Sequence, residues 1–153
     1  MQTTAVIGIG NILRQDDGIG IRVIEFLEAI GIPSYVKWIQ GDIAGLDLIK
    51  YFEYNRVVIV DAAKMGVSPG TVKIFTPKDI NSNGFKDAVS THSIGLKETL
   101  RLAGSLKKIK NVKIVGIEPY SIEFGLEISE ELQEKIPDIC KQVIKLVLPE
   151  LKQ

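Results

Sequence analysis

Residues 4–30 read TAVIGIGNILRQDDGIGIRVIEFLEAI, and the expected fold depends on this stretch. It begins with a short apolar run over 4–9 and continues through Gly10-Asn11, which is typical of a buried strand followed by a turn. Over 19–30 the apolar residues recur on one helical face, and Gly31 ends that pattern. The stretch is therefore predicted to form a strand, a turn and a helix in succession.

Strands and helices are expected to alternate along the rest of the chain. Further strands are predicted at 36–40, 57–60, 71–75 and 112–117, and further helices at 43–52, 94–106 and 128–148. Pro137 is expected to kink or split the last helix, and residues 77–90 are expected to form a long loop. The strand at 71–75 is expected at the edge of the sheet, as a hairpin partner.

This order of elements predicts an α/β fold. Strands that alternate with helices favour a mostly parallel, twisted sheet with helices on both faces. The unbroken VVIV run at 57–60 supports this prediction, because a strand covered on both faces needs no polar alternation. We predict a single domain over residues 1–153, with about five strands sandwiched between helices.

The composition indicates a soluble protein without a nucleic-acid partner. Lys and Arg number 19 and Asp and Glu number 19, so there is no excess positive charge to neutralise phosphates. Cys140 is the one cysteine, which rules out an internal disulfide and fits a reducing compartment. The N-terminus lacks the features of a signal peptide, and no apolar run reaches the roughly 18 residues of a membrane span. We expect a cytoplasmic protein with no membrane contact, and we favour a monomer.

Polar residues follow the predicted strands where a site is expected. In open α/β sheets, sites lie beyond the carboxyl ends of the strands. Asp16-Asp17 follows the first strand, Asp61 follows the run at 57–60, and His92 lies just before the helix at 94–106. Asx residues also cap helices, but two adjacent carboxylates repel each other, so capping explains one member of the pair better than both.

Asp17, Asp61 and His92 together provide two carboxylates and an imidazole. Such a set suits a first-row divalent ion that keeps open positions for water or substrate. Each residue also has a structural interpretation: a cap or turn for the aspartates, and a packed side chain for the lone histidine. Cys140 lies on the apolar stripe of the last helix and is expected to be a buried core residue.

The glycines after the first strand raise the possibility of dinucleotide binding. Gly8 and Gly10 match the start of a G-x-G-x-x-G turn, but the third glycine would fall at Leu13. The glycines are also explained by a tight crossing of strand and helix. A nucleotide-binding α/β domain is therefore kept as an alternative.

Six segments resemble the motifs of a known family. They are GIGNILRQDDGIG (8–20), GDIAGLDLI (41–49), VVIVDAA (57–63), PGTV (69–72), THSIGL (91–96) and VGIEP (115–119). In this order they are similar to the endopeptidases that mature nickel-iron hydrogenases, and they cover nearly the whole chain.

The resemblance implies an aspartyl-type endopeptidase that activates another enzyme. Its substrate would be the large-subunit precursor of a nickel-iron hydrogenase, which loses a C-terminal extension once nickel is inserted. The resemblance places nickel recognition on Asp17, Asp61 and His92, the nickel being that of the precursor, and it implies no organic cofactor. Asp42 matches another acidic position of the family, and Asp17 or Asp42 could act as a general base.

The second turn departs from the common form of the family. The family often has a run of small residues such as Gly-Gly-Thr there, whereas this chain has Asp42-Ile43-Ala44-Gly45. The bulkier Ile43 could change how the precursor tail docks, and Asp42 could instead cap the helix predicted at 43–52. A metal-site chaperone that uses the same residues without proteolysis is the other alternative.

Overall fold

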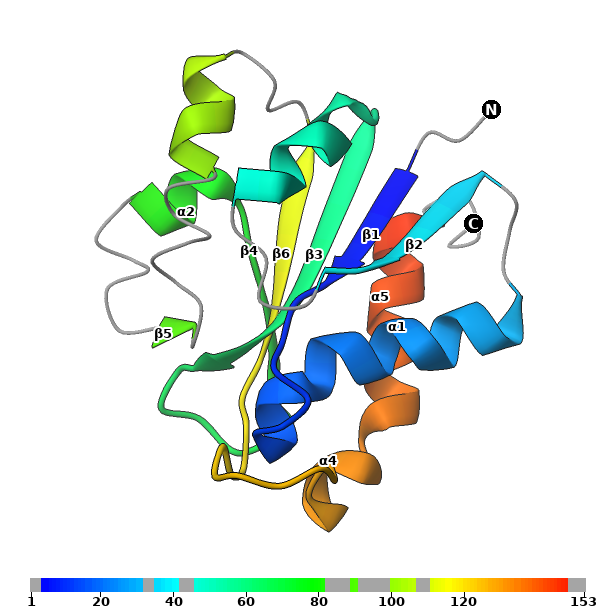
Figure 1. Ribbon diagram of the computed structural model, residues 1–153, viewed down its shortest axis with the longest axis vertical. Helices are drawn as coiled ribbons and strands as arrows, with labels where there is room; N and C mark the ends of the chain where they lie inside the picture. The colour runs from blue at the N-terminus through cyan, green and yellow to red at the C-terminus, as the bar shows by residue number, and fades with distance from the viewer. Residues whose placement is uncertain are drawn as a thin grey trace.

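A twisted, mostly parallel sheet forms the middle layer of the protein (Figure 1). The computed structural model describes residues 4–31, 35–41, 46–81, 89–90, 100–106 and 111–148. The strands are β1 (Thr4–Gly8), β2 (Val36–Gln40), β3 (Arg56–Lys64), β4 (Val72–Phe75), β5 (Val89–Ser90) and β6 (Val112–Ile117). Their order is β2-β1-β3-β6-β4, with β5 paired to β3 outside this path. The predicted fold class, a mostly parallel sheet of about five strands between helices, is confirmed.

One face of the sheet is covered by α1 (Ile19–Ile30) and α5 (Ile136–Val147). Successive strand residues point to opposite faces, so alternate residues of the central strands reach these helices. The buried residues on this face include Val6, Val58, Val60 and Val115 from the sheet, and Val23, Leu27, Ile139 and Val143 from the helices. The last helix of the chain lies parallel to the strands behind α1 in Figure 1.

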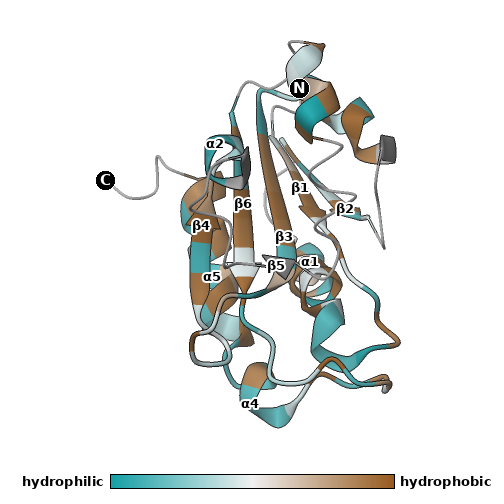
Figure 2. Cartoon of the chain, turned by 90° about the vertical axis from the view of Figure 1, so that its left-hand side faces the viewer, coloured by the Kyte–Doolittle hydropathy of each residue, from teal (hydrophilic) through white to brown (hydrophobic). Residues whose placement is uncertain are grey.

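The opposite face is covered by the 3₁₀ helix η2 (Leu46–Glu53) and by a helical segment at 100–105. Its buried residues include Ala5, Ile7, Ile59 and Ile114 from the sheet, and Leu48, Phe52, Leu100 and Ala103 from the helices. Figure 2 shows the central strands β3 and β6 as largely hydrophobic bands between the two layers. This burial on both faces explains why the VVIV run has no polar alternation.

Two elements differ from the prediction, one in its length and one in its type of helix. Strand β3 continues past residue 60 to Lys64, because residues 61–62 pair with β6 and residues 63–64 pair with β5. The helix predicted at 43–52 is, in its described part, the 3₁₀ helix η2.

The edge strand β4 has a different partner from the predicted one. It lies at the sheet edge as expected, but it pairs antiparallel with β6 rather than forming a hairpin with β3. The reason is that β6 pairs with β3 along residues 57–62 and occupies the position beside it. The region predicted as a loop at 77–90 contains α2 (Pro77–Asn81) and β5, and residues 82–88 lie outside the described residues.

The last helix is split, as predicted from Pro137. Its two parts are α4 (Glu130–Gln133) and α5, and the proline lies in the first turn of α5, where its missing N–H costs nothing. The Ser129 Oγ caps α4 by accepting a hydrogen bond of 3.3 Å from the Leu132 N–H. Within the described ranges, no helix has both the length and the apolar character needed to cross a membrane.

Candidate active site

The turn after β1 brings the chain into very close contact with the start of α1. A Cβ atom at Gly8 would lie 2.3 Å from the Gly20 carbonyl oxygen, and one at Gly10 would lie 2.4 Å from the Asp17 carbonyl oxygen. At Gly20, a Cβ atom would lie 2.3 Å from the carbonyl oxygens of both Ile9 and Val60. These glycines are therefore explained by the tight crossing of strand and helix, without a phosphate ligand.

This crossing places the 3₁₀ helix η1 (Gln15–Gly18) directly beyond β1 and in contact with β3. Asp17 lies in η1, and its side chain is 2% exposed. Its Oδ2 accepts a hydrogen bond of 3.2 Å from the Asn11 N–H, so the carboxylate is turned back towards the loop that leaves β1. Burial of a carboxylate is costly unless polar groups or a cation compensate it.

Asp61 lies on β3 at the same end of the sheet, and it is 1% exposed. The prediction that Asp61 follows its strand is wrong, because β3 continues through it to Lys64. On one side Asp61 pairs with Gly116 of β6, whereas the β1 register ends one residue earlier, at Gly8 opposite Val60. Asp61 therefore lies one residue beyond the last pairing of β1, on the strand that contacts η1.

Asp16 has a role quite different from that of its neighbour. Its side chain is fully buried and accepts four hydrogen bonds from a loop more than 100 residues away. The donors are the backbone N–H groups of Tyr120, Ser121 and Ser129, at 2.9, 3.0 and 2.7 Å, and the Ser129 hydroxyl, at 2.8 Å. One member of the Asp pair is thus structural, but it binds this distant loop instead of capping its own helix.

The same loop is paired with the backbone beside Asp16. The Gly125 N–H donates to the Leu13 carbonyl and the Gln15 N–H donates to the Gly125 carbonyl, both at 2.9 Å. The Arg14 Nε donates to the Ile122 carbonyl at 3.1 Å, and its guanidinium lies 5.0 Å from the centre of the Phe124 ring. These contacts fix η1, and with it Asp17, against the loop that follows β6.

Glu118 is a buried carboxylate that the sequence did not single out as a site residue. It follows β6 directly and is 8% exposed. Its Oε1 accepts hydrogen bonds from the backbone N–H groups of Met65, at 2.6 Å, and Val67, at 3.3 Å. It therefore anchors the turn after β3, and the signal for this role is a carboxylate that directly follows an apolar strand.

The described residues do not contain the whole predicted metal set. Asp42 and His92 both lie outside the described residues. Within the described ranges, no three His, Cys, Asp or Glu side chains are grouped as a metal site. The third predicted donor is His92, so the set formed by Asp17, Asp61 and His92 stays a prediction.

Cys140 is a core residue, as the sequence predicted. It is 3% exposed on α5, among the residues that cover the sheet. Burial raises the pKa of its thiol from the ordinary value of 9.0 to about 11. The thiol therefore stays protonated at neutral pH and takes no part in a nucleophilic site.

The fold and the buried carboxylates define a class of protein: a small α/β domain with acidic side chains at the carboxyl ends of its central strands. Residues 21–146 match the family described as hydrogenase maturation protease. The chain belongs to this family, and the class of enzyme is an endopeptidase.

Individual relatives agree with this assignment. The hydrogenase 2 maturation protease of Escherichia coli K12 is 31% identical over 145 residues, which cover 91% of this chain and 87% of that protein. The solved structure of the hydrogenase maturating endopeptidase HybD from E. coli matches with a TM-score of 0.83 and 28% identity, covering 98% of this chain and 93% of that one. The HybD maturation protease of Thermococcus kodakarensis has the same fold, with a TM-score of 0.80, 24% identity, and 95% and 99% coverage.

Proposed function

We propose that this protein removes the C-terminal extension of a nickel-iron hydrogenase large-subunit precursor after nickel insertion, and that Asp17, Asp61 and His92 recognise the precursor's nickel. The observation that carries this proposal is the placement of two nearly fully buried carboxylates at one end of the sheet. Asp17 and Asp61 come from adjacent elements, η1 and β3, which contact each other. Two carboxylates in such a setting balance the charge of a divalent cation.

The connectivity of β5 supports the inclusion of His92. Ser90 pairs with Ala63, which lies two residues beyond Asp61 on β3. His92 follows Ser90 by two residues, a span of at most about 7 Å along the chain. This short span along the chain is the reason that the proposal includes His92 as the third donor.

The proposed chemistry is hydrolysis of a peptide bond in the precursor. The metal centre of the substrate would place the scissile bond and polarise its carbonyl group. Asp17 or Asp42 would accept the proton of the attacking water as general base. The Asn11 N–H donates to one carboxylate oxygen of Asp17 and helps to hold that side chain in place. The enzyme would be an aspartyl-type endopeptidase that acts in the cytoplasm as a monomer.

Intact mass spectrometry of a nickel-loaded large-subunit precursor tests the proposal. Incubation with the wild-type protein should shorten the precursor by a C-terminal peptide, whereas Asp61→Asn and His92→Ala should leave its mass unchanged. Asp138→Asn is the matched control, because that aspartate is exposed on α5, and it should process at the wild-type rate. Full activity of Asp61→Asn would contradict the site. An unchanged precursor mass with the wild type would favour the metal-site chaperone instead.

A further inference from the structure

The two loops that meet beside Asp16 expose an unusual amount of apolar surface. We call this surface the loop face, and it consists of Ile12, Leu13, Tyr120, Phe124 and Leu126. Phe124 is 81% exposed, Leu126 is 65% exposed and Tyr120 is 59% exposed. Hydrophobic stretches are visible in Figure 2 on the loops beyond the carboxyl ends of the strands. Exposed apolar side chains that gather in this way mark an interaction surface.

Hydrogen bonds made by Asp16 and Gly125 hold the backbone of the loop face in place. Asp16 accepts four hydrogen bonds from the loop after β6, and Gly125 exchanges two backbone hydrogen bonds with residues 13 and 15. These contacts fix the backbone that carries Leu13, Phe124 and Leu126. A partner that binds a fixed surface loses less conformational entropy on association, which favours binding.

The segment that carries most of the loop face is acidic, and its glutamates outnumber the two arginines that contact it, Arg14 over the Phe124 ring and Arg22 on the Leu126 carbonyl. Residues 119–134 contain five glutamates and no Lys or Arg, in a chain whose net charge is zero. The glutamates are Glu123, Glu127, Glu130, Glu131 and Glu134, all of them exposed. Among the described residues the one ion pair near this segment is formed by Arg22 with Glu25, and it includes none of these five glutamates. This local excess of negative charge is complementary to a basic surface.

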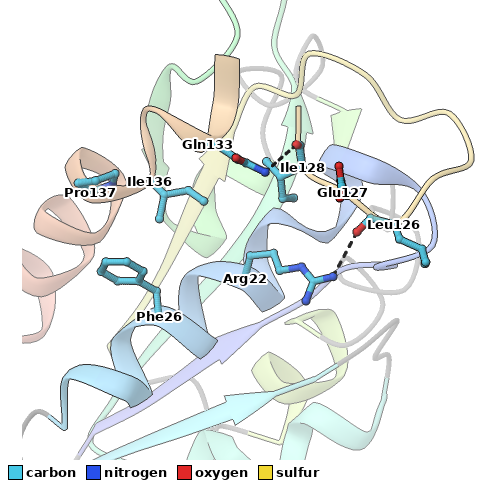
Figure 3. Close-up of a pocket in the computed structure, with 8 residues that line it drawn as sticks. All are labelled: Arg22, Phe26, Leu126, Glu127, Ile128, Gln133, Ile136 and Pro137. Atoms are coloured by element: carbon cyan, nitrogen blue, oxygen red, sulfur yellow. Dashed lines mark hydrogen bonds between the residues drawn. The ribbon is translucent and has the colours of Figure 1, made fainter. Parts of the chain in front are cut away.

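A groove continues the apolar surface from Leu126 towards the helices. It has a volume of about 630 Å³ and lies between α1, α5 and the loop at 126–128. Figure 3 shows Phe26 of α1 and Ile136 of α5 beside the same space, with Ile128 nearby. The Arg22 guanidinium donates to the Leu126 carbonyl at 3.3 Å and closes one side of the groove. The groove thus offers a recess for apolar side chains next to the exposed Phe124 and Leu126.

The loop face also adjoins the proposed site. Ile12 and Leu13 lie between Asn11, which donates to Asp17, and the start of η1. We infer that the loop face and the adjoining groove dock the folded body of the protein substrate, through a surface of that substrate that is both apolar and basic. This inference rests on the proposed function, and it names the surface that recognises the precursor apart from its nickel.

Two independent double variants test the docking surface, with steady-state processing of the nickel-loaded precursor as the readout. Phe124→Ser with Leu126→Ser removes apolar area, and Glu127→Lys with Glu131→Lys reverses charge. Each should raise KM about tenfold or more and leave kcat little changed, because central apolar anchors and paired charges contribute that much to binding. The charge variant should also lose most of the salt dependence of KM.

Controls come from equally exposed positions elsewhere. Leu106→Ser alters a leucine that is 51% exposed beyond the helical segment at 100–105, and Glu28→Lys alters an exposed glutamate near the end of α1. Both should keep the wild-type KM. A wild-type KM in both double variants would overturn the docking surface and leave the proposed function intact. Absence of processing by the wild-type protein would overturn the proposed function, and this inference with it.

Discussion

The adjacent aspartates Asp16 and Asp17 have different roles in the structure. Asp16 is fully buried under four hydrogen bonds from the loop at 120–129, whereas Asp17 turns to the Asn11 N–H and the proposed site. The sequence indicated that one of the pair is structural, because two carboxylates side by side repel each other. It could not indicate the partner of Asp16, since that loop follows it by more than 100 residues.

Replacement of the structural aspartate should mainly affect stability. Asp16→Ala leaves three partly buried backbone N–H groups without their acceptor, so the free energy of unfolding should fall by about 2 kcal/mol or more. Asp17→Asn should lower it by less than about 1 kcal/mol and should abolish processing. Urea denaturation followed by circular dichroism measures both. Equal stability of Asp16→Ala and the wild type would contradict the role assigned to Asp16.

The buried thiol of Cys140 gives a second prediction about a single side chain. Because burial raises the pKa of Cys140 to about 11, the folded protein should resist a thiol reagent at neutral pH and react once it is unfolded in urea. The unfolded thiol ionises near 9.0, so above that pH the unfolded state binds fewer protons than the folded state. Stability should therefore fall between pH 9 and pH 11, and Cys140→Ala should reduce that fall. Rapid labelling of the native protein would contradict the burial of this side chain.

At the scale of elements, the crossing of β1 and α1 determines where the site lies. Gly8 and Gly20 let the helix approach the strand so closely that backbone atoms meet, and η1 is thereby placed over the end of β1. The strand, turn and helix of this unit were all predicted from periodicity. The continuation of β3 to Lys64 cannot be predicted in this way, because it depends on pairing with β6 and β5, and a local pattern contains no information about strands further along the chain.

Replacement of Gly20, at the crossing of β1 and α1, by a larger residue should destabilise the fold. In Gly20→Ala the new Cβ would lie 2.3 Å from two backbone carbonyl oxygens, and the backbone must shift to accept it. The free energy of unfolding should fall by several kcal/mol, as in other cases of overpacking between rigid atoms. Gly31→Ala is the control, because a Cβ atom at Gly31 would meet no other atom within 4 Å. The one penalty there is the left-handed backbone, at φ 75°, so the free energy of unfolding should fall by about 1 kcal/mol. A milder effect at Gly20 than at Gly31 would contradict the close crossing.

For the whole molecule, the sheet brings distant segments to one edge. Parallel strands end at the same side, so buried carboxylates from three parts of the chain lie towards one edge of the sheet: Asp17 beyond β1, Asp61 in the second half of β3 and Glu118 after β6. For Asp17 and Asp61 the shared edge is expected from the predicted alternation of strands and helices, whereas Glu118 was not among the predicted site residues. The position of β4 beside β6 and the anchoring role of Glu118 do not follow from this alternation, since both depend on strand order and on contacts between loops.

The central claim is that Asp17, Asp61 and His92 recognise nickel in a precursor that the enzyme then cuts. The most direct measurement is the intact mass of the large-subunit precursor, prepared with and without nickel, after incubation with the wild-type protein and with Asp61→Asn. We expect loss of a C-terminal peptide only when the nickel-loaded precursor meets the wild-type protein. Equal cleavage of the nickel-free precursor, or cleavage by Asp61→Asn at the wild-type rate, would contradict the claim.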